Sequence, residues 1–160
     1  MSDPFNLQRF VDAQEGDFSI ALSEIRAGSK QSHWIWYIFP QLAGLGSSAM
    51  AARYGLQGPA EATAYLRDSA LRTRLLAVAA AVASHLRHRP APALDDLMGS
   101  EIDALKLVSS MTLFREIARR LNQVEPLPDL EELGAQADAI LRAAAEQDYP
   151  ECAVTRRQLA

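Results

Sequence analysis

The stretch that decides the fold runs from Lys30 to Gly46 and reads KQSHWIWYIFPQLAGLG. It contains both tryptophans of the chain, together with one of the four tyrosines and one of the five phenylalanines. Aromatic side chains bury the largest apolar area per residue, and a buried indole N–H or phenol O–H needs a hydrogen-bond partner. The polar residues that can supply such partners, or bind a ligand, are Lys30, Ser32, His33 and Gln41.

The local structure of this stretch is ambiguous from periodicity alone. From Ser32 to Ile38 the run of aromatic and β-branched residues fits a buried strand as well as a buried helix. Ser32 can cap a helix, and the rest of the chain offers no convincing partner strand. The sequence therefore favours a short helix, which Phe39 must leave because a residue before proline is driven to extended geometry.

Helical signals continue on both sides of this stretch. Upstream, Asp3 and Asp17 are typical helix caps, which predicts one helix that ends near Gly16 and a second that ends at Gly28. Downstream, caps and apolar repeats predict helices at about 48–54, 59–67, 69–89, 100–122 and 129–146. We predict an all-α fold, a compact single-domain bundle of about six to eight helices over residues 3–147. A loosely ordered polar C-terminal tail is expected at 148–160.

Composition restricts the class of protein. At 160 residues and 17.5 kDa the chain suits one domain, which buries roughly 70% of its unfolded surface. A net charge of -4 argues against a mainly electrostatic hold on nucleic acid. Cys152 is the only cysteine, which excludes an intrachain disulfide and cysteine-based zinc sites. Without a secretory signal or an apolar run that spans a bilayer, we expect a soluble cytoplasmic protein with no membrane partner.

A second polar set lies on the predicted helix at 100–122. Asp103, Lys106 and Ser110 follow one another at i, i+3 and i+7, so they share one face of that helix. This face either meets water or lines a polar pocket. In water, the Asp103–Lys106 pair would contribute only about 0.2–0.5 kcal/mol and would have no functional meaning.

Three motifs carry a resemblance to a known family. They are GxKxSHWxWxIFPQ from Gly28, GLGxS from Gly44 and DxxKLxSSxTLF from Asp103. The chain resembles, from Phe10 to about Leu141, the uncharacterised family called domain of unknown function 1810. The resemblance implies a compact single domain, and it implies no activity, cofactor or catalytic residue. Some members carry the label calpastatin, but nothing here resembles a disordered protease inhibitor.

We predict a ligand pocket where residues 30–41 meet the helix at 103–112. An indole can stack on a flat ring, a lysine can neutralise phosphate or carboxylate, and hydroxyl groups can orient the ligand. A nucleotide or ADP-ribose-like molecule suits this set, and its hydrolysis would use His33 or Asp103 as general acid or base. The sequence identifies no cofactor. The predicted ligand-binding residues are Lys30, Ser32, Trp34, Trp36, Gln41, Lys106 and Ser110.

Two alternatives use the same residues differently. In one, the aromatic stretch is the interface of a non-enzymatic interaction or homo-oligomerisation module, because aromatic residues are enriched at interface centres. In the other, the aromatic residues are core, His33 is a buried histidine with its hydrogen bonds satisfied, and the site lies elsewhere. His85 and His88 have metal-ligand spacing but no neighbouring carboxylate, so they are interpreted as partners of a helix C-terminus and no metal site is predicted.

Overall fold

A computed structural model describes residues 2–160, and regular structure in this range is helical apart from one isolated bridge between Leu42 and Leu56. The predicted all-α class is confirmed. Nine helices occur in the described range, more than the six to eight predicted, because two helices that the sequence did not indicate, α6 and α9, are present. The helices are α1 (Gln8–Ala27), α2 (Ile35–Ile38), α3 (Ala49–Tyr54), α4 (Pro59–Arg67), α5 (Ser69–Leu86), α6 (Leu94–Met98), α7 (Glu101–Val124), α8 (Pro128–Glu146) and α9 (Ala153–Leu159).

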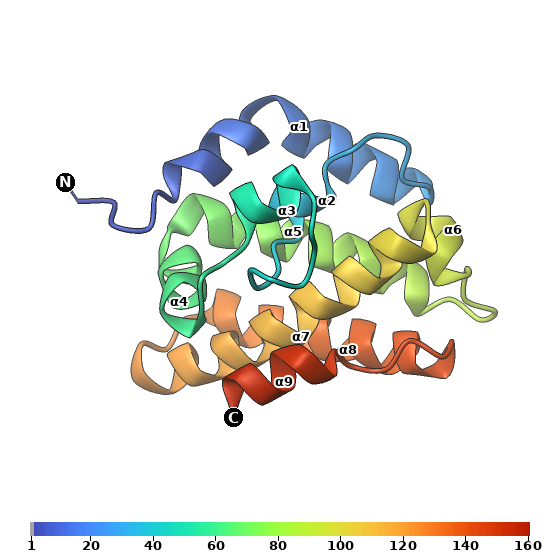
Figure 1. Cartoon of the computed structure of the whole chain (residues 1–160). Coiled ribbons are helices and arrows are strands. Elements are labelled where there is room, and N and C mark those ends of the chain that lie inside the picture. The colour runs from blue at the N-terminus through green and yellow to red at the C-terminus, as the bar shows by residue number, and fades with distance from the viewer. Residues whose placement is uncertain (1) are drawn as a thin grey trace.

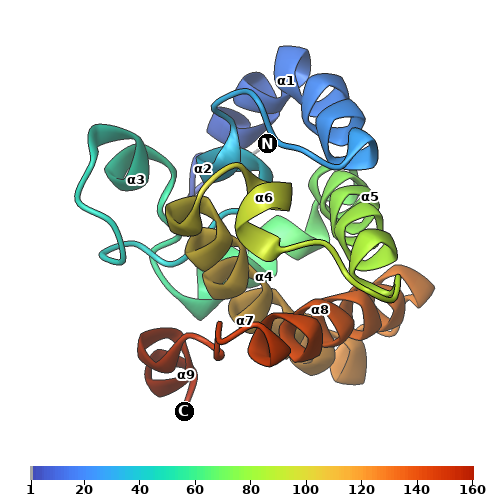
Figure 2. The same cartoon turned by 90° about the vertical axis from the view of Figure 1, so that its right-hand side faces the viewer.

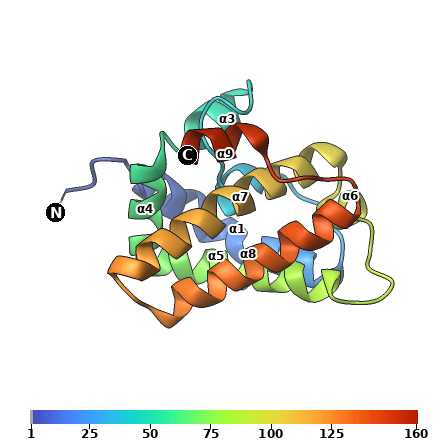
Figure 3. The same ribbon diagram turned by 90° about the horizontal axis from the view of Figure 1, so that it is seen from below.

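The longest helix, α7, lies at the centre of the arrangement (Figure 1). Helices α2, α4, α6, α8 and α9 all pack against it. Helix α5 packs against α8, and α1 packs against α5 (Figure 2). Seen from below, α7 and α8 run side by side as two long neighbours (Figure 3). Almost all of the core is therefore built around α7 and α5.

Helix starts in this fold follow the capping chemistry of the sequence. Ser48, Asp68 and Ser100 each accept a hydrogen bond from the backbone N–H three residues later, at 3.0 to 3.1 Å. These bonds satisfy backbone donors that a helix leaves free at its first turn. The predicted starts of α3, α5 and α7 are confirmed. The predicted short helix before Pro40 is confirmed as α2, but it follows Trp34 rather than a cap at Ser32, and its last residue is Ile38.

The N-terminal region differs from the prediction, because α1 is one continuous helix rather than two. Gly16 lies exposed within it, and Asp17 does not cap a helix but accepts a hydrogen bond from the hydroxyl of Tyr37. Glycine within a helix costs about 1 kcal/mol relative to alanine. The buried stripe of α1 outweighs this cost, because Phe10 packs against Tyr54 and Tyr65 at one end of the helix while Ile25 lies beside α5 at the other.

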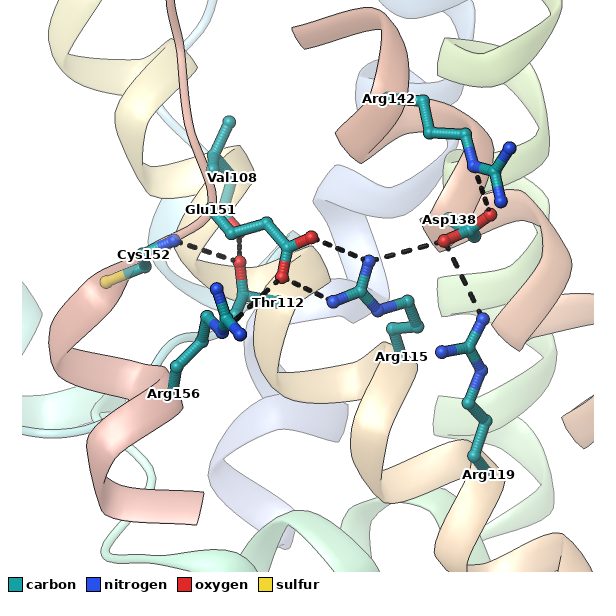
Figure 4. A network of polar contacts seen from close by, with 9 residues as sticks. All are labelled: Val108, Thr112, Arg115, Arg119, Asp138, Arg142, Glu151, Cys152 and Arg156. Carbon is teal, nitrogen blue, oxygen red and sulfur yellow. Dashed lines mark hydrogen bonds and ion pairs between the residues drawn. The ribbon is translucent and has the colours of Figure 1, made fainter. Parts of the chain in front are cut away.

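The C-terminal segment also differs from the prediction, because residues 153–159 form α9, which packs on α7. Arg115 of α7 pairs with Glu151 just before α9 and lies 3.3 Å from Asp138 of α8 (Figure 4). Next to this pair, the Thr112 hydroxyl accepts the backbone N–H of Cys152 at 3.2 Å. The polar residues of the segment therefore include one, Glu151, that attaches it to a charge on α7.

Glu151→Gln should loosen α9 by weakening its charged attachment to Arg115. The hydrogen bond to a charged partner contributes about 1.5–3 kcal/mol, and Arg115 keeps Asp138, so the rest of the domain should stay folded. Hydrogen exchange at the amides of 152–159 should then be faster. Glu146→Gln is the control, because Glu146 pairs only with exposed Arg89 at 4.0 Å. Equal exchange rates in the wild type and Glu151→Gln would show that the pair does not hold the segment.

Candidate functional site

The turn before α2 is held by the carboxylate of Glu24, in the last turns of α1. Its Oε1 accepts the backbone N–H groups of Gln31 and Ser32, at 2.8 and 2.9 Å. The indole N–H of Trp34 donates to the same oxygen at 3.0 Å, and the Ser32 hydroxyl donates to Oε2 at 2.5 Å. Burial by itself raises the pKa of Glu24. The four hydrogen bonds, of which the one from the Ser32 hydroxyl has the largest effect, outweigh burial and lower the pKa to about 2.

Glu24 was missed by the sequence analysis, although one signal was present. A carboxylate in the last turns of a helix opposes the negative end of the helix dipole. Glu24 lies four residues before Gly28, the residue that ends α1. Such a position requires compensating donors, and the turn that follows supplies them.

Lys30 connects this turn to α7. Its Nζ lies 2.8 Å from the carboxylate of Asp103 and donates to the backbone oxygen of Ser32 at 2.5 Å. It also lies 4.9 Å from the ring centroid of Trp34. The side chains of Lys30 and Asp103 are only 5% and 17% exposed, so the ion pair is largely buried. The charge of Lys30 is therefore neutralised within the protein by the carboxylate of Asp103.

Helix α6, which the sequence did not predict, supports Lys30 from the other side. The backbone N–H of Lys30 donates to the carbonyl of Leu97 at 2.9 Å. Gly99, which ends α6, has a φ of 84° and lies so close that a Cβ there would sit 2.9 Å from the Lys30 carbonyl oxygen. Only glycine meets both conditions without strain. The start of α7 is thereby held against the turn.

The two polar sets found in the sequence meet at a shallow groove of about 320 Å³ on the surface. We call it the lysine groove. The predicted site residues that line it are Lys30, Ser32, His33, Trp36, Asp103 and Lys106. The convergence of these two distant segments was predicted, and the 2.8 Å contact between Lys30 and Asp103 joins them directly.

Two predicted ligand-binding residues lie elsewhere, in the interior. Trp34 is 1% exposed, its N–H is bonded to Glu24, and its ring packs 6.3 Å from that of Phe39. Ser110 is fully buried, because the polar face of α7 is no longer at the surface two turns beyond Asp103. Neither side chain reaches the lysine groove, so the prediction that they contact the ligand is corrected.

Lys106 differs from Lys30 in having no ionic partner. It is half-buried, and across residues 2–160 its amine makes no ion pair or hydrogen bond. It lies where the lysine groove meets two further hollows, one of which contains Gln41 and the 45–48 loop. Lys30 and Lys106 are the only lysines of the chain, and every other basic residue apart from the three histidines is arginine. Both lysines thus belong to this one site.

Trp36 adds a second donor at the same place. Its side chain is half-buried and borders both the lysine groove and a small hollow that Lys106 also lines. The indole N–H is buried and finds no acceptor within the described part of the chain. A buried donor without a partner costs about 1–3 kcal/mol. A ligand or a water molecule beside the amine of Lys106 can supply the acceptor that this donor lacks.

The histidines also differ in their placement. His33 is exposed on the rim of the lysine groove, so the interpretation of His33 as a buried histidine is wrong. His85 contacts the carbonyl of Ile25 through Nε2 at 2.6 Å and so links α5 to α1. Within residues 2–160, no cluster of three histidine, cysteine or carboxylate side chains is placed to hold a metal ion.

The sequence matches, over residues 4–130, the family described as Protein of unknown function (DUF1810). The chain belongs to the DUF1810 family. The identification from the three motifs is thereby confirmed. This DUF1810 domain is similar to the conserved hypothetical protein Rv1873 from Mycobacterium tuberculosis, with 38% identity and a TM-score of 0.69 over 91% of this chain and 99% of that one.

No curated protein matches this DUF1810 chain. The descriptions of the family and of Rv1873 name no activity. Within the described range of the DUF1810 domain, none of the helices is both long enough and apolar enough to cross a membrane.

Glu24→Gln should destabilise the DUF1810 domain by about 2 kcal/mol at pH 7, because an uncharged amide accepts these hydrogen bonds more weakly. The folded state lowers the pKa of Glu24 from 4.5 to about 2. Its contribution to stability is therefore complete above pH 4.5 and disappears as the pH falls towards 2. Urea unfolding at pH 7, 4 and 3 should show the difference from wild type shrinking with acidity. Glu15→Gln, at an exposed position of α1, is the control. A difference that stays constant over this pH range would contradict the assignment.

Lys30→Met and Asp103→Leu should each destabilise the domain by about 3 kcal/mol, because each leaves one charge largely buried without its partner. The double variant removes both charges and should lose less than the sum of the two single losses. A double-mutant cycle from denaturant unfolding measures this coupling. Additive losses would show that the ion pair is not the contact that joins the turn to α7.

Proposed function

We propose that the lysine groove binds a small anionic molecule and that Lys106 is its cationic contact. The observation that carries the proposal is the amine of Lys106, half-buried at the meeting point of three hollows and without a carboxylate partner in residues 2–160. Lysine is rarely buried without a partner. Since Lys30 and Asp103 neutralise each other, Lys106 leaves the groove positive in a protein of net charge -4.

The remaining walls of the groove favour an organic anion over a simple ion. Trp36 supplies an aromatic surface and a free N–H, and Ile102 supplies an apolar edge. A volume of about 320 Å³ is near the lower limit of small-molecule pockets. A nucleotide or ADP-ribose-like molecule combines phosphates with hydroxyl groups and an organic part, and so has the chemistry that this region recognises.

Hydrolysis of the bound molecule is the reaction that we associate with this groove. His33 and Asp103 both border it, and each can transfer a proton in such a reaction. Asp103 is engaged by Lys30, whereas the imidazole of His33 makes no hydrogen bond or ion pair with the rest of the described chain. His33 is therefore the group that we assign as general acid or base, with Asp103 as the residue that positions Lys30.

The interaction-module alternative has less support from the same residues. Trp34, Tyr37 and Phe39 are 1%, 6% and 1% exposed, so most of the aromatic stretch is core. Trp36, the fourth aromatic residue of the stretch, is half-buried. A single aromatic side chain offers little of the apolar centre that a stable interface needs.

Acetylation of lysine in the intact protein tests the proposal directly, because the chain has two lysines and the Lys30 side chain is only 5% exposed. A ligand at Lys106 should slow its acetylation by about tenfold at a ligand concentration roughly ten times Kd. The probes are inorganic pyrophosphate and ADP-ribose, and mass spectrometry of peptides separates Lys106 from the terminal amine. Product analysis with ADP-ribose, for wild type and His33→Asn, tests the hydrolysis.

Calorimetric titration of two charge variants supplies the control. Lys106→Gln should abolish binding of both probes, whereas Arg157→Gln removes an equal charge from an exposed position of α9 and should leave binding unchanged. If neither probe protects Lys106 or binds the wild type, the proposed function is wrong. Binding that survives Lys106→Gln would place the anion elsewhere.

A further inference from the structure

A second hollow lies directly beside the lysine groove, between the loop that joins α2 to α3 and the first turns of α7. We call it the serine hollow. It has a volume of about 350 Å³ and shares Ile102 and Lys106 with the lysine groove. The amine of Lys106 therefore lies between two concave surfaces of similar size. A ligand whose anionic group binds Lys106 can extend in both directions.

The chemistry of the serine hollow differs from that of the groove. Lys106 is the only charged residue among those that line it. Its apolar walls come from Leu45, Ile102 and Leu105, and the last two are 64% and 48% exposed. Its polar groups are uncharged, and they are the side chains of Gln41, Ser47, Ser48 and Ser109.

One cation, apolar walls and uncharged polar groups favour some chemical groups of an anionic ligand over others in the serine hollow. A second phosphate would need another cation, and the residues that line the hollow supply none besides Lys106. A bare sugar would leave the exposed side chains of Ile102 and Leu105 against hydroxyl groups. A heteroaromatic ring covers these apolar walls with its face and offers its edge to neutral hydroxyl and amide groups.

We infer that the ligand is a nucleotide whose base lies in the serine hollow and whose phosphate group contacts Lys106. This inference rests on the proposed function and adds to it the position of the base. The lysine groove then receives the part of the ligand beyond the phosphate, next to Trp36, His33 and Ser32. The indole of Trp36 thus faces the far end of the ligand and not the base.

Calorimetric titration of the full chain with ADP and with inorganic pyrophosphate separates the contribution of the base from that of the anion, because pyrophosphate has the anion without the base. Wild type should bind ADP about tenfold more tightly than pyrophosphate. Leu105→Ala removes an apolar wall at a 48% exposed position, so the fold should be unaffected. This variant should weaken ADP about fivefold and leave pyrophosphate unchanged. Val124→Ala, at a 72% exposed position on the far end of α7, is the matched control and should change neither.

The outcomes distinguish this inference from the proposed function. Equal affinities for ADP and pyrophosphate would overturn the nucleotide inference and leave the anion site at Lys106 intact. A preference for ADP that Leu105→Ala does not reduce would also overturn it, because the base would then lie outside the serine hollow. Absence of binding by both probes would overturn the inference together with the proposed function.

Discussion

The carboxylate of Glu24 is the constraint on which the functional surface depends. It accepts two backbone N–H groups, a hydroxyl and an indole N–H from the turn at 31–34. The turn held in this way places Lys30 2.8 Å from Asp103. Lys30 is in turn the polar link between the turn and α7, so the lysine groove forms only where α1, the turn and α7 come together. An acidic residue that lines no part of the groove therefore controls its shape.

Helix α7 serves the core and the site at the same time. Its buried face includes Leu107, Met111 and Phe114 and receives α4, α8 and α2. Its first turns carry Asp103 and Lys106, which both border the lysine groove. The two lysines of the chain have different roles. Lys30 is neutralised within the protein, whereas Lys106 has no ionic partner among the described residues. A rigid central helix is a suitable support for such a site, since packing fixes the direction of its side chains.

Much of the fold was predictable because it depends on local chemistry. Helix caps at Ser48, Asp68 and Ser100 satisfy backbone donors within three residues, so they can be recognised without the rest of the structure. The errors concern elements that depend on distant partners. Helix α1 continues through Gly16 because α5 supports it, and residues 153–159 fold because α7 supplies Arg115 to Glu151. Local propensity is outweighed in both places by packing that sequence spacing does not describe.

The sequence by itself determined the all-α class, the family, most helix starts and the two polar sets that meet at the site. Only the tertiary structure decided which side chains of those sets reach the surface. Trp34 and Trp36 are equivalent by composition, yet Glu24 holds one inside while the other borders the groove. Likewise, Asp103 neutralises Lys30 and leaves Lys106 free. The reason is physical: burial and charge pairing depend on how helices far apart in the chain cross, and residue spacing within one helix carries no information about that crossing.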